Sequence, residues 1–165
     1  MRVKIKKTND NAIIPFKTYD NDFCYDVVAV SEEEVAPNVW KYGIGIALQI
    51  DRQRGCPYCN VERHIKDGKV QVCEDYNISV DFRPRSSVWR TGMVLSNCEG
   101  TIDEQFRGEI SAVFYHVMTD MPRYKIGDKI GQIKLGFTLP IEFVEVDELD
   151  ETERGAKGYG STDAK

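Results

Sequence analysis

The amino-acid sequence predicts an all-β fold, a jelly-roll-like β-barrel or a sandwich, from three observations. Several short segments alternate apolar and polar residues, as half-buried strands do. Gly, Pro, Asn and Asp separate these segments, which is typical of turns between strands. The one candidate helix, residues 91–97, is short and contains Gly92, which disfavours a helix. Many short strands with few helices indicate a jelly roll, sandwich or barrel.

The predicted strands follow one another along the chain at residues 3–6, 44–50, 78–82, 110–115 and 130–135. Residues 51–77 interrupt the strand pattern because they are polar and rich in Cys, Lys and Arg, so we expect an insert at about 52–76. From Glu142 to Glu153 seven of twelve residues are acidic, which predicts an extended, solvated connector. We therefore expect a β domain over residues 1–145, followed by an acidic linker and a Gly-rich arm over 146–165.

Length and charge limit the possible functions. The 165 residues fit one domain with a sizeable core. A net charge of −5, from 22 Lys and Arg against 27 Asp and Glu, argues against binding duplex nucleic acid. The sequence contains no apolar run of membrane-span length and no secretory leader, so we expect a cytoplasmic protein without a membrane partner. Five cysteines without a leader predict reduced thiols.

The segment Arg154 to Asp163 combines groups that bind phosphate. Three glycines allow backbone N–H groups to approach an anion, and Arg154 offers a bidentate donor. Ser161 and Thr162 add hydroxyls, and Tyr159 adds a ring that can stack on a base. The alternative is a disordered Gly/Ser tail, which is common at C-termini.

Four further clusters precede this tail, namely 23–27, 83–87, 100–108 and 127–132. The most specific pieces are Pro84-Arg85-Ser86-Ser87, Thr101-Ile102-Asp103 with Phe106-Arg107-Gly108, and Thr152-Glu153-Arg154-Gly155 with Tyr159-Gly160-Ser161-Thr162. In this order the five clusters closely resemble the five motifs of the trimeric deoxyuridine triphosphatases (dUTPases). The resemblance spans roughly residues 20 to 163 apart from the insert.

The resemblance implies hydrolysis of dUTP to dUMP and pyrophosphate on a jelly-roll homotrimer whose C-terminal arms are exchanged between subunits. This activity keeps uracil out of DNA and supplies dUMP for thymidylate synthesis. Asp103 is then the base that activates water, although an Asx-turn role for Asp103 stays open. Mg²⁺ is expected as a cofactor, held mainly by the triphosphate and waters.

The resemblance also implies a set of substrate-binding residues. Arg85, Ser86, Ser87 and Gln132 are expected to hold phosphates, Asp26 to support them, and a hairpin over 97–111 to present Asn97 and backbone groups to uracil. Phe106 stands where the family usually has Tyr, beneath the deoxyribose, and Tyr159 stands where Phe is usual, over uracil. The full set is Asp26, Arg85, Ser86, Ser87, Asn97, Gly100, Thr101, Ile102, Phe106, Ser111, Gln132, Arg154, Tyr159, Gly160, Ser161 and Thr162.

Two departures from the family pattern occur in the tail, where Lys157 and Asp163 replace glycines. In the segment Ser87-Val88-Trp89-Arg90 the arginine is similar to that of the dCTP deaminases, a related family with the same fold. A dCTP deaminase is therefore the alternative enzyme. Those enzymes need a Glu at the place of Val113, and they lack this tail, so dUTPase is favoured. A third possibility is a dUTPase-like regulator that binds a protein partner through the insert, as is thought of some viral and phage dUTPases, so a bacterial or phage-infected cell is a plausible setting.

The insert also contains candidate metal ligands. Cys56-x-x-Cys59 has the spacing of two thiolates on one ion, and His64 and Cys73 could complete a structural zinc site. The spacing is incomplete, because strong zinc sites pair two close-spaced couples. Ordinary reduced thiols remain the alternative.

Overall fold

The computed structural model describes residues 2–51, 65–66, 69–70 and 77–156 of the chain. In chain order its elements are β1 (Arg2–Lys7), β2 (Tyr25–Val28), β3 (Ser31–Ala36), β4 (Val39–Gly43), β5 (Ile46–Asp51), β6 (Ile65–Lys66), β7 (Lys69–Val70), β8 (Asn77–Arg83), the 3-10 helix η2 (Ser86–Thr91), β9 (Met93–Leu95), β10 (Gly100–Asp103), β11 (Ser111–His116) and β12 (Lys129–Thr138).

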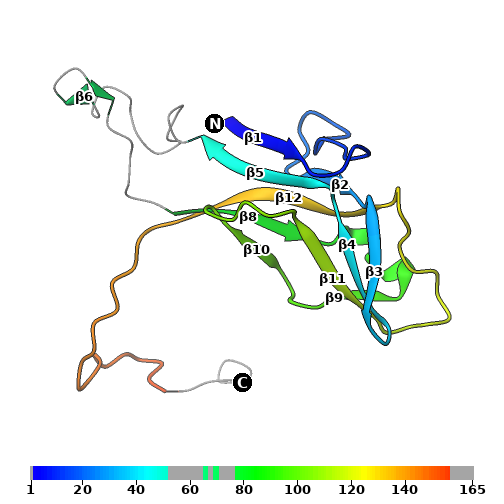
Figure 1. The fold of residues 1–165 in the computed structure, drawn as a ribbon. Coiled ribbons are helices and arrows are strands. Elements are labelled where there is room, and N and C mark those ends of the chain that lie inside the picture. The colour runs from blue at the N-terminus through cyan, green and yellow to red at the C-terminus, as the bar shows by residue number, and fades with distance from the viewer. Residues whose placement is uncertain (1, 52–64, 67–68, 71–76, 157–165) are drawn as a thin grey trace.

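Two four-stranded antiparallel sheets form the body, in the orders β10-β8-β12-β2 and β3-β4-β11-β9 (Figure 1). A two-stranded sheet, β1-β5, lies beside them, and the short β6 and β7 pair with each other. The all-β prediction is confirmed, and the five predicted strands coincide closely with β1, β5, β8, β11 and β12.

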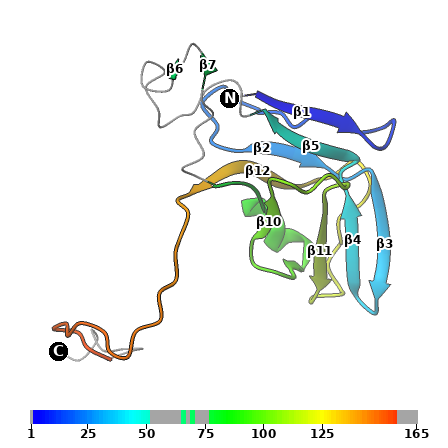
Figure 2. The same cartoon turned by 60° about the vertical axis from the view of Figure 1, so that its left-hand side comes forward.

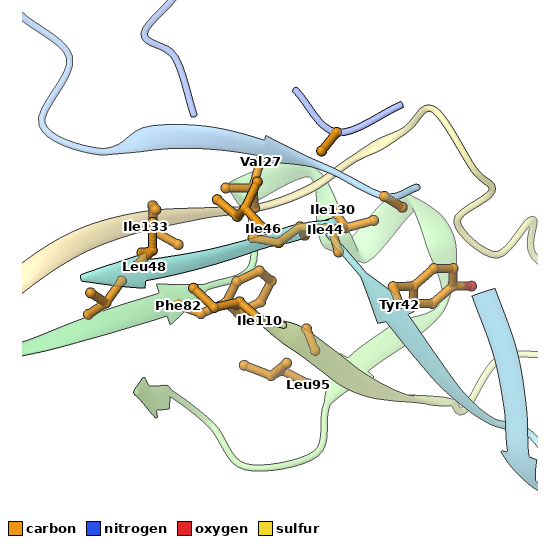
Figure 3. Close-up of a cluster of buried hydrophobic side chains, with 14 of the residues drawn as sticks. Val27, Tyr42, Ile44, Ile46, Leu48, Phe82, Leu95, Ile110, Ile130 and Ile133 are labelled. Carbon is orange, nitrogen blue, oxygen red and sulfur yellow. The ribbon is translucent and has the colours of Figure 1, made fainter. Parts of the chain in front are cut away.

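The core lies between the sheets because alternate residues of each strand face inward. On β8, Ile78, Val80 and Phe82 are buried in the apolar cluster. Figure 3 shows Phe82 within this cluster. Phe114 of β11 contacts Phe82 edge-on at a centroid distance of 6.3 Å. It contacts Tyr42 of β4 in the same way at 6.0 Å. Each such side chain contributes about 2–3 kcal/mol by burial, so the core fixes how the two sheets face each other.

The opposite face of β8 is polar and contains one buried charged pair. Asp81 is 8% exposed and binds Lys134 of β12, its cross-strand neighbour, as well as the Ser79 hydroxyl. Burial alone would raise the pKa of Asp81, but the hydrogen bonds from Lys134 and Ser79 lower it below the ordinary value of 3.8. Asp81 is therefore ionised at neutral pH and ties β8 to β12.

Two local predictions are wrong. Residues 91–97 are not a helix, because η2 ends at Thr91, Gly92 follows with φ of +62°, and Met93 begins strand β9. Residues 97–111 are not a hairpin, because β10 pairs with β8 whereas β11 pairs with β4 and β9. This segment instead crosses from one sheet to the other.

After β12, residues 139–156 leave the body as an extended segment without strand or helix, as both views show (Figures 1 and 2). Its apolar side chains are exposed, and Phe143 reaches 90%. This is the conformation predicted for the acidic connector. Within the part of the chain that the structure describes, no helix is long and apolar enough to cross a membrane.

Candidate functional site

The predicted phosphate-binding residues lie where β8 ends. After Arg83 the chain passes through Pro84 and the extended Arg85 into η2, which begins with Ser86. A guanidinium and two hydroxyls therefore follow one another at one end of the sheet. Proline before Arg85 stops the strand because it has no N–H to donate.

Asp26 lies at the same end, on β2 and opposite Gln132 of β12. Its carboxylate is 5% exposed and divides its two oxygens among three donors. Oδ2 accepts a bond of 2.8 Å from Lys129 Nζ. Oδ1 accepts a bond of 3.3 Å from Gln132 Nε2 and lies 3.4 Å from Arg85 Nε. Three of the predicted residues, Asp26, Arg85 and Gln132, are thus in contact.

The charge state of Asp26 follows from these contacts. Burial alone would raise its pKa, but hydrogen bonds from Lys129 and Gln132, with the charges of Arg85 and Lys129, lower it below 3.8. An ionised Asp26 holds Arg85 through Nε. An open hollow of about 390 Å³ borders this group and is lined by Thr18, Tyr19, Asp22, Phe23, Cys24, Asp26, Arg85 and Gln132.

The predicted base lies on the other edge strand of the same sheet. Asp103 is the last residue of β10 and is exposed, opposite Ser79 of β8. The Phe106 N–H donates to the Asp103 carbonyl at 3.0 Å and closes a turn. Asp103 and the half-exposed Phe106 border one small cavity together with Ile102.

The predicted uracil-binding residues are only partly brought together. Gly100 and Thr101 lie on β10 beside Asp103, and the exposed Asn97 precedes them. Ser111 begins β11 in the other sheet, and it borders a separate hollow with Glu109 and Lys41. The described fold therefore does not bring Ser111 to the Asp103 group.

The strand register separates the two groups widely. Asp26 stands in the row of Gln132, whereas Asp103 stands in the row of Ser79 and Gly136. Four residues along β12 span about 13 Å, and three strand spacings from β2 to β10 span about 14 Å, so Asp26 and Asp103 lie about 20 Å apart. The two groups therefore lie on opposite edge strands of the sheet and in different rows of it.

Several predicted residues fall outside the described ranges. These are Tyr159, Gly160, Ser161 and Thr162 of the tail and the candidate zinc ligands Cys56, Cys59, His64 and Cys73. Arg154 is described and exposed, on the extended arm. Among the described residues, no three His, Cys, Asp or Glu side chains are grouped so as to hold a metal ion.

Sequence reasoning missed Lys129. Its Nζ binds Asp26, lies 3.4 Å from Thr18 Oγ1 and sits over the Phe16 ring at 4.7 Å. The signal was present, because Lys129 belongs to the cluster 127–132, in which only Gln132 had been assigned a role.

Comparisons with known proteins agree on one family. The dUTPase family model matches residues 70–163. A deoxyuridine 5'-triphosphate nucleotidohydrolase of Clostridium novyi is 33% identical over 98% of this chain and 99% of its own length.

Solved structures share the fold. A dUTPase variant of Staphylococcus bacteriophage 80alpha, in complex with dUpNHpp, has a TM-score of 0.71 at 18% identity and covers 98% of both chains. A dUTPase variant of phage phi11 of S. aureus, described for its coordination of a structural Mg(II) ion, has a TM-score of 0.62 at 16% identity over 90% of this chain and 98% of that chain. The fold is thus the predicted jelly-roll-like β-barrel, and the chain belongs to the dUTPase family.

Proposed function

We propose that this dUTPase hydrolyses dUTP to dUMP and pyrophosphate with Asp103 as the general base, in active sites shared between subunits of a homotrimer. The observation that carries the proposal is the division of the family's residues into two groups about 20 Å apart on one sheet. Family membership supplies the substrate and the reaction.

The proposed reaction is an attack of water on the α-phosphorus. Asp103 takes a proton from the water as the new oxygen–phosphorus bond forms, and the bond to the β-phosphate oxygen breaks to release pyrophosphate. Asp103 suits this role because its side chain is exposed at the end of an edge strand. Loss of a general base costs about 10²–10⁴ in rate.

The hollow at Asp26 is the proposed phosphate site. Asp26 binds Arg85 through Nε, so the two terminal nitrogens of the guanidinium remain for bidentate contact with phosphate oxygens. Ser86, Ser87 and Gln132 add neutral donors around it. Lys129 offsets the charge of Asp26, so that Arg85 keeps its attraction for the polyanion.

Mg²⁺ is the proposed cofactor, bound mainly through the triphosphate and waters, where it would neutralise charge on the phosphate oxygens. The donor set fits this mode rather than an all-protein site, because the Asp26 carboxylate is already bound by Lys129, Gln132 and Arg85. The phi11 dUTPase, described for its coordination of a structural Mg(II) ion, supports the choice of metal.

In a homotrimer the two groups could meet, because they would come from different subunits. One subunit would supply the phosphate hollow, and a neighbour would supply Asp103, Phe106 and the uracil-binding backbone of β10. Ser111 borders another hollow of its own chain, so it would contact the uracil ring only through such an assembly. Sharing of sites is typical of the trimeric family.

The arm is proposed to reach a further subunit. From Thr138 to Arg154 an extended chain spans up to about 50 Å. Leu139, Ile141 and Phe143 alternate along it like a strand with one apolar face, yet all are exposed.

A surface for this arm exists at β1. In the described part of the chain β1 pairs with β5 on one side and with no strand on the other. An apolar hollow of about 460 Å³ lies beside it, with Val3, Ile5 and Leu135 in its lining. We propose that the arm of another copy adds to this edge, which would place Arg154, Tyr159, Gly160, Ser161 and Thr162 over a nucleotide.

No observation favours the deaminase alternative. Val113, at the position where that chemistry needs a Glu, is apolar, and the nearby Glu109 carboxylate is bound to Thr8 and Gly45. We propose separately that the insert at 52–76 contacts a protein partner, and that the enzyme works in the cytoplasm, where nucleotide pools lie. Replacing 52–76 with a Gly-Ser linker should leave dUTP turnover intact.

The experiment that tests the function measures pyrophosphate release from each dNTP, with the wild type and Asp103→Asn. We expect release from dUTP above all other dNTPs, a rate lower by about 10²–10⁴ in Asp103→Asn, and unchanged dUTP binding by calorimetry. Near-wild-type turnover in Asp103→Asn would refute the mechanism. Ammonia release from dCTP would support the deaminase instead.

A further inference from the structure

We infer that Glu109 is a positioning residue that fixes the loop directly after Asp103, and that it acts on the active site of a neighbouring subunit. This inference rests on the proposed function, because it takes Asp103 as the base and the site as shared. Nothing in the proposed mechanism gives Glu109 a role.

Glu109 fastens three segments that are distant in sequence. Its Oε1 accepts the Gly45 N–H at 3.1 Å, in the turn between β4 and β5. Its Oε2 accepts the Thr8 hydroxyl at 3.1 Å, directly after β1. The two oxygens thus connect the loop to the β1-β5 sheet and to the β4–β5 turn.

The surrounding backbone is shaped to receive this carboxylate. Gly45 has φ of +69°, a conformation that favours glycine and that turns its N–H toward Glu109. A Cβ at Gly43 would collide with the Glu109 carboxylate, so the absence of a side chain at Gly43 leaves the space it occupies. Next in the chain, Ile110 donates its N–H to the Ile46 carbonyl at 2.9 Å.

These bonds fix one end of a short loop whose other end carries the base. Asp103 is held by the pairing of β10 with β8, and residues 104–108 cross to the other sheet before Glu109. Within the loop the Phe106 N–H donates to the Asp103 carbonyl, and Arg107 donates to the Glu104 carbonyl. With the Glu109 carboxylate bound to Gly45 and Thr8, only the five residues 104–108 lie between the two fixed ends of the loop.

Without the Glu109 carboxylate the backbone bonds of Ile110 with Ile46 and Ile44 remain, but residues 104–108 lose their side-chain anchor and gain freedom to move relative to the nucleotide. The defect would appear in the site to which the loop is donated. A misplacement of about 1 Å can cost about a hundredfold in rate, so we expect a smaller shift to cost about tenfold in kcat. The phosphate hollow of the same chain lies on β2 and β12 and would keep its affinity.

The first test compares single variants for kcat, KM and melting temperature. Glu109→Ala should lower kcat about tenfold with KM little changed. Glu109→Gln, which keeps an acceptor for Gly45 N–H, should recover most of the rate. Glu34→Ala is the matched control, because it removes a carboxylate that likewise accepts a backbone N–H, that of Asn38 at 3.0 Å, in the β3–β4 hairpin. Wild-type kcat in Glu109→Ala would overturn the inference.

The second test places the defect in the donated loop. Glu109→Ala chains are refolded with an equal amount of Arg85→Ala chains, whose hollow is inactive. One quarter of the sites then combine an intact hollow with an intact loop, so the mixture should reach about one quarter of the wild-type rate and exceed both parents. If Glu109→Ala instead impaired the hollow of its own chain, the mixture would reach only about one twentieth of the wild-type rate.

The outcomes separate this inference from the function on which it rests. If Asp103→Asn is inactive and complements Arg85→Ala, but Glu109→Ala chains do not, only the role of Glu109 is wrong. If Glu109→Ala does not fold, Thr8→Val removes one of the two bonds without removing the carboxylate and should lower kcat by a smaller factor. A wild-type kcat in Thr8→Val and in Glu109→Gln, with no gain on mixing, would then reject the inference.

Discussion

Mixing Arg85→Ala chains with Asp103→Asn chains should restore dUTP hydrolysis that neither variant shows alone. The reason is the separation of about 20 Å between the Asp26 and Asp103 groups on one sheet. If a neighbour supplies Asp103, an active site needs its hollow from an Asp103→Asn chain and its loop from an Arg85→Ala chain. With equal amounts and random exchange, one site in four meets both conditions.

The expected rate is therefore about one quarter of the wild-type rate, against parents reduced by about a hundredfold or more. The assay is pyrophosphate release at saturating dUTP, after the two chains are unfolded and refolded together. Native mass spectrometry of chains with different tags confirms mixed trimers. If mixed trimers form and the rate stays at the level of the parents, one chain supplies both groups and the geometric reasoning is wrong.

Four further predictions concern contacts of the fold and the cysteines of the insert. Lys129→Met should raise KM for dUTP about tenfold, because Asp26 loses its closest cation and its carboxylate then competes with the phosphates of dUTP for Arg85. Lys125→Met on the exposed turn is the control and should leave KM unchanged. The lowered pKa of Asp81 gives stability that is present above about pH 4 and lost as the pH falls through its folded pKa, so acid titration of the unfolding free energy should show this loss. Lys134→Met should cost about 3–5 kcal/mol at pH 7 and flatten that loss, as chemical denaturation at each pH would show. If Cys56, Cys59, His64 and Cys73 bind zinc, elemental analysis should find one zinc per chain in protein expressed with zinc, and less in Cys56→Ser. The turnover of dUTP should be the same in both. Substoichiometric zinc in the wild type would reject the metal site.

The strands that the sequence predicted best are those with one buried face. On β8 every second residue enters the core, and on β12 Ile133 and Leu135 keep this alternation after a register shift near Ile130, so the pattern revealed both strands. The hairpin of β3 and β4 was not predicted, because β3 contains Glu32, Glu33 and Glu34 and is an edge strand whose residues are mostly exposed. An edge strand needs little apolar surface, so local pattern does not reveal it.

Pairing between distant segments was harder to predict than the strands themselves. The hairpin over 97–111 was expected from the family resemblance, but β10 and β11 pair with strands in different sheets. The motif residues suggested the chemistry, and only the register revealed that Asp103 and Asp26 stand on opposite edge strands, about 20 Å apart. The role of Lys129 also needed the fold, because its partner Asp26 is 103 residues away.

The composition of the arm has a consequence for the chain before it finds its neighbours. A newly made subunit exposes Leu139, Ile141, Phe143 and Leu149 on a segment without a core of its own, which invites aggregation. The seven acidic residues between Glu142 and Glu153 are interleaved with these side chains. Mutual repulsion of the carboxylates keeps single arms apart, while β1, which among the described strands pairs only with β5, is the proposed place for each arm to bind. The same residues, 139–153, thus combine charges that keep the free arm soluble with the apolar side chains proposed to bind a neighbouring subunit.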